Sequence, residues 1–284
     1  MRAALEVFEQ ILAEKEERID LARACLLIAQ DAYPDLDADR YLGDIERLAI
    51  RLRARLPQSA QPDERVVALN QFLYNDLGFW GNTDDYYDPR NSYLNEVIDR
   101  RTGIPITLGI LYIELGRRVG LPLQGISFPG HFLVRLTLRG GTLVLDPFSG
   151  GLPQGEDELR RRLERVIPDH ARRGVPLAEL PLDQFLEPAT KRQILSRLLR
   201  NLKGIYRQTD KPERLLAVLN RMLAIAPGAS AELRDRGFLY QRLECWRFAM
   251  KDLSQYLDRE PDAPDLDDVR AALMELGARC ARLN

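Results

Sequence analysis

The sequence predicts an α+β protein whose central part carries the strands and whose two ends are helical. Three observations predict this class. Apolar residues recur every three or four positions through residues 1–80, a Gly-Gly pair near residue 140 joins two short apolar segments, and helical periodicity returns after residue 190. We expect a helical cap over residues 1–80, an α+β core over residues 81–185 and a helical domain over residues 190–284.

The first 80 residues are predicted to form helices that each bury one face. One apolar stripe ends at Tyr33, just before a proline, and a second covers residues 41–56. A third stripe follows the acidic segment 62–64, where the helix dipole favours carboxylates. This part of the chain is therefore expected to contain helices alone.

The central part combines a helix with strands. Residues 103–119 are predicted to form a strongly apolar helix, because Pro105 suits a first helical turn. Residues 132–137 have the alternation of a strand, and Gly140-Gly141 turns the chain into a second strand over residues 142–145. A helix followed by a hairpin indicates an α+β core.

The last part of the chain contains a repeat. Pro227 and Pro261 are 34 residues apart, which is the period of a tetratricopeptide helix pair. Apolar residues match at this offset, among them Leu199 with Leu233, Tyr206 with Tyr240 and Leu219 with Leu253. The second unit also has Gly237 and Ala249, small residues where the motif needs its two helices close together. We therefore predict tetratricopeptide-like helices.

Composition excludes several classes of protein. The chain has 284 residues, 45% of them hydrophobic and 30% charged, which excludes a disordered chain. No apolar run approaches the roughly 20 residues of a membrane span, and no signal peptide is visible, so we expect a cytoplasmic protein without membrane contact. A net charge of −2 disfavours a nucleic-acid partner. Three widely spaced cysteines and two histidines suggest no disulfide framework, metal site or cofactor.

Two residues of the predicted hairpin form the main candidate for chemistry. His131 precedes the first strand and Asp146 closes the second, 15 residues later. An antiparallel hairpin can bring such positions side by side, so that the carboxylate orients the imidazole. That is the base and orienter pair of an acyl-transfer site, which also needs a nucleophile, usually at a helix N-terminus.

Four motifs closely resemble the bacterial SirB-type family of uncharacterised proteins. They are Asn91-Ser92-Tyr93-Leu94-Asn95, Arg101-Thr102-Gly103-Ile104-Pro105-Ile106, Pro129-Gly130-His131-Phe132-Leu133-Val134-Arg135 and Asp146-Pro147-Phe148. The resemblance covers nearly the whole chain. It implies a transglutaminase-like core, similar also to papain-like enzymes, followed by tetratricopeptide repeats. It also implies that His131 and Asp146 occupy the His and Asp positions of the catalytic triad.

The nucleophile that the resemblance implies is missing. The family pattern puts the cysteine about 15 residues before a Gly-Ile-Pro-like turn, and counting back from Gly120 reaches Pro105. Thr107 and Ser92 are the hydroxyl alternatives, but Thr107 lies about 200° around the helix from position 105. Cys25 has apolar helical neighbours, which indicate a buried structural thiol.

The remaining candidates have structural alternatives. Asn91 and Asn95 are one helical turn apart, so they either face a shared pocket with Tyr87 or cap the helix ahead of residue 103. The arginines of residues 160–162 indicate a solvent-facing helix side, and His170, in a polar stretch, is expected to be solvated. His131 itself is either a structural relic, part of a binding pocket, or a catalytic base.

The sequence predicts a non-catalytic scaffold that binds a protein or peptide through the core cleft and the repeats. The alternative is a hydrolase or acyltransferase that uses His131 and Asp146 with an unusual nucleophile or with water. A DNA-binding regulator is the third class, and the charge balance disfavours it.

Overall fold

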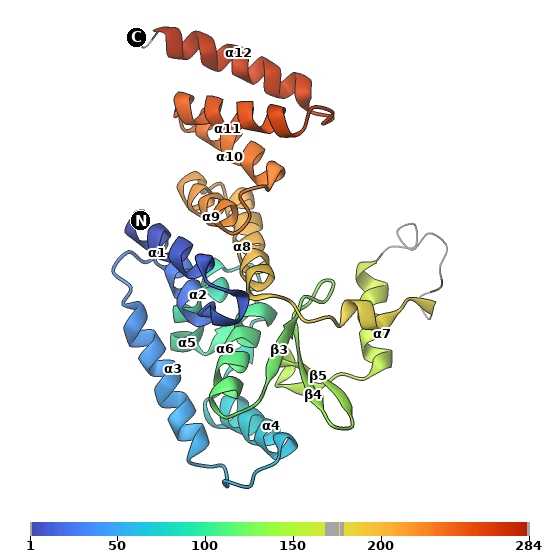
Figure 1. Ribbon diagram of the computed structural model, residues 1–284. Coiled ribbons are helices and arrows are strands. Elements are labelled where there is room, and N and C mark those ends of the chain that lie inside the picture. Colours follow the sequence, from blue (N-terminus) through green and yellow to red (C-terminus); the bar gives the residue numbers. More distant parts are fainter. Residues whose placement is uncertain (1, 168–175, 177–178, 283–284) are drawn as a thin grey trace. The chain divides into compact units, whose positions relative to one another are not determined.

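The computed structural model describes residues 2–167, 176 and 179–282. The chain divides into two compact units, residues 1–198 and 199–284, and each is treated by itself (Figure 1). The first unit contains the segments that the sequence assigns to the cap and to the α+β core. His170, which is expected to be solvated, lies outside the described residues.

Helices open the first unit, as predicted. Their bounds are α1 Arg2–Ala13, η1 Glu16–Arg18, α2 Leu21–Ala29, α3 Ala38–Arg53 and α4 Pro62–Asn70, which continues into the π-helical turn η2 Gln71–Asp76. Asp20 and Asp37 cap α2 and α3 by accepting hydrogen bonds from the amides of Arg23 and Arg40, at 3.0 and 3.1 Å. Helix α2 ends at Ala29, earlier than the expected Tyr33, because the chain continues in turns from there.

A central helix organises the first unit. It is α6 Pro105–Arg118, preceded by η3 Pro89–Ser92 and α5 Leu94–Arg100. Most of its residues are buried, because other helices pack on one side of it and the sheet on the other (Figure 1). The short strand β1 Trp80–Gly81 pairs in parallel with β2 Thr102–Gly103, just ahead of α6.

The sheet has four antiparallel strands in the order β3-β4-β5-β6. They are β3 Leu123–Ile126, β4 Leu133–Leu138, β5 Gly141–Asp146 and β6 Leu152–Pro153, with the turn η4 Pro147–Ser149 between the last two. The predicted β4–β5 hairpin is confirmed, with Val134 opposite Leu145 and Leu138 opposite Gly141. Strands β3 and β6 were not predicted, because four and two residues are too few to establish an alternation.

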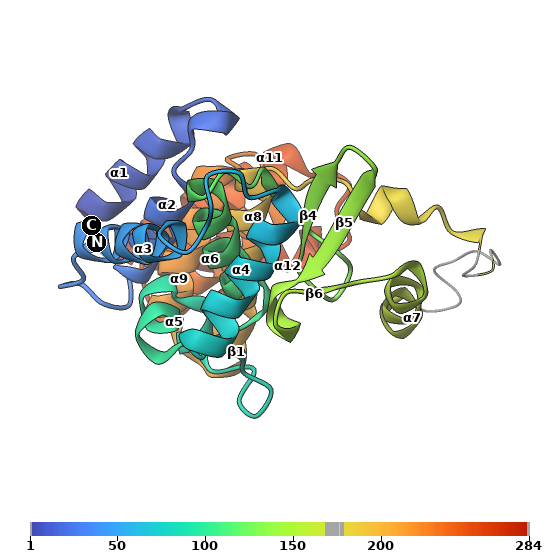
Figure 2. The ribbon, with the colours of Figure 1, turned by 90° about the horizontal axis from the view of Figure 1, so that it is seen from below.

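Helices cover both faces of this sheet. Figures 1 and 2 show α6 on one side of β3–β5 and α7 Glu156–Val166 on the other. Leu159 and Leu163 of α7 belong to one buried cluster with residues of the sheet, among them Ile126, Leu133 and Val144. On the α6 side, the ring of Phe132 lies so close that a Cβ at Gly109 would come within 2.5 Å of it. Phe132, just ahead of β4, and Leu133, its first residue, are therefore buried on opposite faces of the sheet.

The second unit consists of helices, as the repeat predicted. Helix α8 Lys191–Gln208 enters it, and α9 Pro212–Ile225, α10 Ser230–Arg242, α11 Trp246–Arg259 and α12 Leu266–Arg282 follow. Gly237 and Ala249 sit at close helix contacts, since Ala249 is fully buried and a Cβ at Gly237 would lie 2.7 Å from Leu253. The expected role of these small residues is confirmed.

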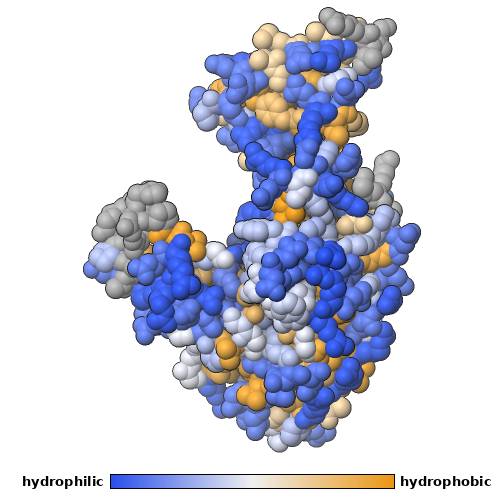
Figure 3. Space-filling model, turned by 180° about the vertical axis from the view of Figure 1, so that it is seen from behind, coloured by the Kyte–Doolittle hydropathy of each residue, from blue (hydrophilic) through white to orange (hydrophobic). Residues whose placement is uncertain are grey.

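The surface of the chain carries no continuous apolar belt on the face shown in Figure 3, where hydrophobic side chains are scattered among hydrophilic ones. Among the described helices, none combines the length and the apolar character needed to cross a bilayer.

Candidate functional site

The predicted pair of the hairpin comes together. His131 lies just ahead of β4 and Asp146 is the last residue of β5, so the antiparallel register brings them to the same end of the sheet. His131 Nε2 is 2.9 Å from Asp146 Oδ1. Asp146 is fully buried, while 13% of the His131 side chain is exposed. A carboxylate therefore fixes one ring nitrogen of a partly accessible histidine.

Asp146 is surrounded by donors. Arg162 Nη2 and Ser149 Oγ are 2.9 and 3.0 Å from Asp146 Oδ2, and the Phe148 amide donates to Oδ1 at 3.0 Å. Burial by itself raises the pKa of the Asp146 carboxyl, but the hydrogen bond from His131 and the charges of His131 and Arg162 outweigh it and hold that pKa below its ordinary value. Asp146 is therefore a buried, fully satisfied carboxylate.

The lowered pKa of Asp146 predicts a pH dependence of stability. A carboxyl whose pKa is lower in the folded state stabilises the fold above its unfolded pKa of about 4, and this stabilisation is lost as the pH falls through the folded pKa. We expect Asp146→Asn to be less stable than the wild type at pH 6, with the difference shrinking below about pH 4. Urea denaturation of both proteins from pH 3 to 7 tests this, and a pH-independent difference would contradict it.

The other ring nitrogen of His131 is available. Nδ1 makes no hydrogen bond within the part of the chain that the structure describes. The imidazole packs edge-on against Phe148 with ring centroids 5.9 Å apart, and Phe148 in turn contacts Tyr86 at 6.3 Å. Gly81 makes room for this arrangement, because a Cβ there would come within 2.5 Å of the Phe148 ring. His131 thus offers one nitrogen beside aromatic rings.

Position 105 carries no reactive group. Pro105 is the first residue of α6 and is buried. The nearby hydroxyl of Thr107 has a structural role, because its Oγ1 donates to the Asn91 carbonyl at 2.7 Å and accepts from the Ile104 amide at 3.1 Å. Ser92 is 1% exposed, and its Oγ has no hydrogen-bond partner among the described residues.

Cys25 is a buried structural thiol, as expected. It lies on α2 and is 1% exposed. Burial raises the pKa of the Cys25 thiol far above its ordinary value, and the nearby carboxylates of Glu114 and Asp20 raise it further. Such a thiol stays protonated, whereas a catalytic cysteine needs a lowered pKa. It is also the one cysteine in residues 1–198.

The three residues of the expected pocket lie in different surroundings. Asn91 is fully buried and fastens the preceding loop, since its Nδ2 donates to the Asp85 carbonyl at 2.7 Å and its Oδ1 accepts from Asn82 at 3.2 Å. Asn95 is 4% exposed, and its Oδ1 has no partner among the described residues. Tyr87 is 71% exposed. The two asparagines are therefore buried whereas Tyr87 is exposed, and a pocket shared by the three stays a prediction.

Arg162 is the site residue that the sequence interpretation missed. The expected solvent-facing side of residues 160–162 is wrong for this arginine, which reaches Asp146, although it holds for Arg161 with its exposed partner Glu158. The signal was present: Leu159 and Leu163 mark the buried face of α7, and position 162 lies on that face, three residues after Leu159.

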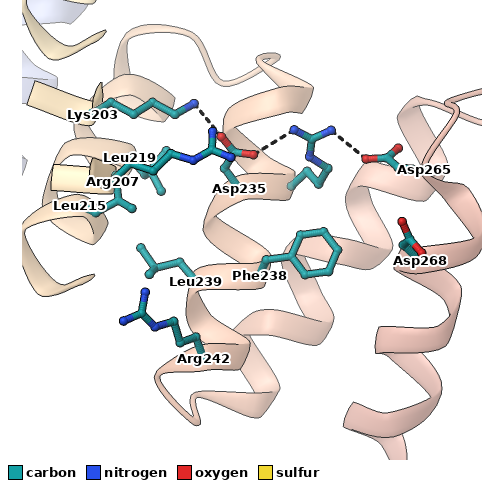
Figure 4. A pocket seen from close by; sticks show the side chains of 11 residues that line it. Lys203, Arg207, Leu215, Leu219, Asp235, Phe238, Leu239, Arg242, Asp265 and Asp268 are labelled. Atoms are coloured by element: carbon teal, nitrogen blue, oxygen red, sulfur yellow. Dashed lines mark hydrogen bonds and ion pairs between the residues drawn. The ribbon is translucent and has the colours of Figure 1, made fainter. Parts of the chain in front are cut away.

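The second unit has a cavity of about 410 Å³ between α8, α9, α10 and the start of α12 (Figure 4). Its wall carries a chain of ion pairs, in which Lys203 contacts Asp235 at 2.7 Å and Arg234 contacts Asp235 and Asp265 at 3.0 and 2.7 Å. Burial opposes ionisation of Asp235, but Lys203 and Arg234 keep its pKa below the ordinary value. The apolar part of the cavity lining consists of Leu215, Leu219, Phe238 and Leu239.

The described residues contain no group of three or more His, Cys, Asp or Glu side chains placed to hold a metal ion.

Comparison with known proteins agrees with this architecture. The profile of the transglutaminase-like superfamily matches residues 39–200, and a tetratricopeptide-repeat profile matches residues 202–274. The UPF0162 protein of Xylella fastidiosa (strain Temecula1) is 42% identical over 272 residues, which is 96% of this chain and 95% of that protein. The UPF0162 protein of Vibrio cholerae is 30% identical over 252 residues (88% and 90%), and Protein SirB1 of Salmonella typhimurium is 28% identical over 231 residues (81% and 82%).

Proposed function

Because the chain belongs to the UPF0162 and SirB1 family of transglutaminase-like proteins with C-terminal tetratricopeptide repeats, we propose that it is a non-catalytic scaffold that binds a protein or peptide partner. In this proposal the protein is cytoplasmic and needs no cofactor. The core keeps the His and Asp of an acyl-transfer fold and uses them for recognition, while the repeats add a second binding surface.

The observation that carries the proposal is the state of the thiols in the core. The resemblance assigns the nucleophile to position 105, where this chain has a buried proline at the start of α6. Cys25, the one thiol within residues 1–198, is 1% exposed and has a raised pKa. Thiolate attack needs an accessible thiol with a pKa near or below neutrality. The core meets neither condition.

The His131–Asp146 pair suits recognition. Asp146 has a full set of donors and holds His131 in one orientation, with its ring against Phe148, which in turn contacts Tyr86. A ring nitrogen beside aromatic edges can bind a polar group of a peptide, such as a backbone amide or a hydroxyl, next to an apolar side chain. Rigid positioning lowers the entropy lost on binding.

The repeat cavity supports the second surface. Its ion-paired wall and its apolar lining face one another in Figure 4, where Phe238 lies between Leu239 and Asp268 in the view. The ion pairs order these long side chains before any partner arrives. A cavity with an apolar part and a polar part fits an extended segment that has an apolar side chain among charged ones.

A second candidate function is hydrolysis with water as the nucleophile. The observation that favours it is the orientation of His131, because Asp146 holds Nε2 and leaves Nδ1 as a possible general base. A positioned base contributes about 10²–10⁴-fold to a rate. The Thr107 hydroxyl does not replace water as the nucleophile, since it is hydrogen-bonded to the carbonyls of Asn91 and Ile104.

His131→Ala separates the two functions. We assay the full chain, His131→Ala and the control His170→Ala for hydrolysis of p-nitrophenyl esters and peptide anilides between pH 5 and 9, and we compare their partner capture side by side. If the protein is a scaffold, the wild type hydrolyses the substrates no faster than His131→Ala. Capture of the partner is then weaker with His131→Ala than with the wild type or His170→Ala. Hydrolysis that rises near neutral pH and disappears in His131→Ala would establish the enzyme instead.

A further inference from the structure

A cavity of the first unit is lined by arginines. It has a volume of about 320 Å³ and lies between α3, the segment that follows η2, and the end of α5. Its charged lining residues are Arg40, Asp44, Arg47, Arg51, Asp99 and Arg101. The cavity is separate from His131 and Asp146, neither of which lines it.

The lining carries an excess of positive charge. Four arginines face two aspartates, which gives a formal charge of +2 in a chain whose net charge is −2. Both aspartates already have partners: Asp44 is ion-paired with Arg47, and Asp99 accepts a hydrogen bond from Tyr41 at 2.5 Å. Both carboxylates are already counted in the +2, so two guanidinium charges of the lining remain without a balancing carboxylate.

Arg51 and Arg101 are the arginines without a carboxylate partner within the described part of the chain, and each is held by another contact. The guanidinium of Arg51 lies over the ring of Phe72, 5.5 Å from its centroid. Arg101 Nη1 donates to the Leu77 carbonyl at 2.7 Å. Their remaining N–H groups are free to bind an anion, and their positions are partly fixed before it arrives.

The backbone of Arg101 adds a further reason to assign this side chain a role. Arg101 ends α5 in the left-handed region, with φ of 57°. Glycine is the usual residue there, because the Cβ of any other residue is strained in this conformation. An arginine at this position places a guanidinium at the cavity at the expense of backbone strain.

We propose that this cavity binds a phosphate monoester. Guanidinium groups present paired N–H donors that match phosphate oxygens, and a phosphate monoester carries about −1.5 to −2 charge at pH 7, which balances the +2 of the lining. Leu48, Leu77, Phe79 and Ile98 provide an apolar wall for the organic group of the ester. The phosphate belongs either to a free small molecule or to a phosphorylated side chain of a partner.

Calorimetric titration of the full chain tests this site. The probes are phenyl phosphate, a phosphoserine hexapeptide, and phenol and the unphosphorylated hexapeptide as controls. We expect saturable binding of at least one phosphorylated probe and of neither control, weakened by added salt. The probe that binds more tightly identifies the source of the phosphate, whether a small molecule or a protein side chain.

Arg51→Gln is the informative variant, because Arg51 contacts a ring face and its removal leaves no buried group unpaired. It should weaken binding about tenfold or more, while Arg139→Gln, an exposed arginine in the β4–β5 turn, should not change it. Arg51→Lys should fall between the two, since lysine keeps the charge but loses the paired donors. Absence of saturable binding up to about 10 mM, or equal binding by Arg51→Gln and the wild type, would overturn the proposal.

Discussion

Asp146→Ala should lower the free energy of unfolding of residues 1–198 by about 3–5 kcal/mol. The carboxylate is fully buried and satisfies His131, Arg162, Ser149 and the Phe148 amide. Alanine removes all of these acceptors at once and leaves Arg162, whose side chain is only 21% exposed, with Glu158 as its remaining carboxylate partner, 3.3 Å from Nε. Removing one member of a buried ion pair costs more than the pair contributes, because the other charge remains buried.

Tryptophan fluorescence isolates the effect to one unit. The chain has two tryptophans, Trp80 in the first unit and Trp246 in the second, so the Trp246→Phe background reports on the first unit alone. Glu164→Gln is the matched control, because Glu164 is exposed and lies on the same helix as Arg162. If Asp146→Ala and Glu164→Gln shift the urea midpoint equally, the carboxylate does not hold the site together.

Asp252→Ala should have the corresponding effect in the repeats, with a loss of about 2–4 kcal/mol for residues 199–284. Its carboxylate, 3% exposed, accepts two hydrogen bonds from Arg236, from Nε at 2.6 Å and from Nη2 at 2.9 Å. This fork joins α11 to α10, the two helices that Gly237 brings into close contact. Arg236 also donates to Asn220 Oδ1 of α9 at 2.9 Å, so the same arginine connects three helices.

The measurement uses the Trp80→Phe background, in which Trp246 reports on the repeats. Asp258→Ala is the control, because it removes an exposed carboxylate from the same helix. We expect urea to unfold Asp252→Ala at a clearly lower midpoint than Asp258→Ala. Equal midpoints would show that the Arg236 fork contributes little to the stability of the repeats.

Much of the fold could be predicted from the sequence, because its signals are local or periodic. The β4–β5 hairpin follows from an alternating segment and a Gly-Gly turn, and the repeat follows from the offset between Pro227 and Pro261. The pairing of His131 with Asp146 follows from the hairpin, since an antiparallel register brings the start of one strand to the end of the next.

The rest depends on tertiary contacts that have no local signal. An asparagine in the sequence can line a pocket or hold a loop. For Asn91 only the tertiary structure shows that its amide is bonded to the loop before it. Arg162 looked like part of a charged helix surface until α7 was seen to pack on the second face of the sheet. Strand β3 is four residues long and includes Gly125, so it becomes a strand only beside β4.

The absence of an activated thiol is the central claim, and site-resolved alkylation tests it most directly. Native wild-type protein and His131→Ala are treated with iodoacetamide at pH 7, and the labelling of Cys25, Cys245 and Cys280 is followed by mass spectrometry. We predict that Cys25 stays unlabelled until the protein is unfolded, and that the rates at Cys245 and Cys280 are the same in both proteins. Fast labelling of Cys25 that slows in His131→Ala would contradict the account, because it would show that the histidine activates a thiol.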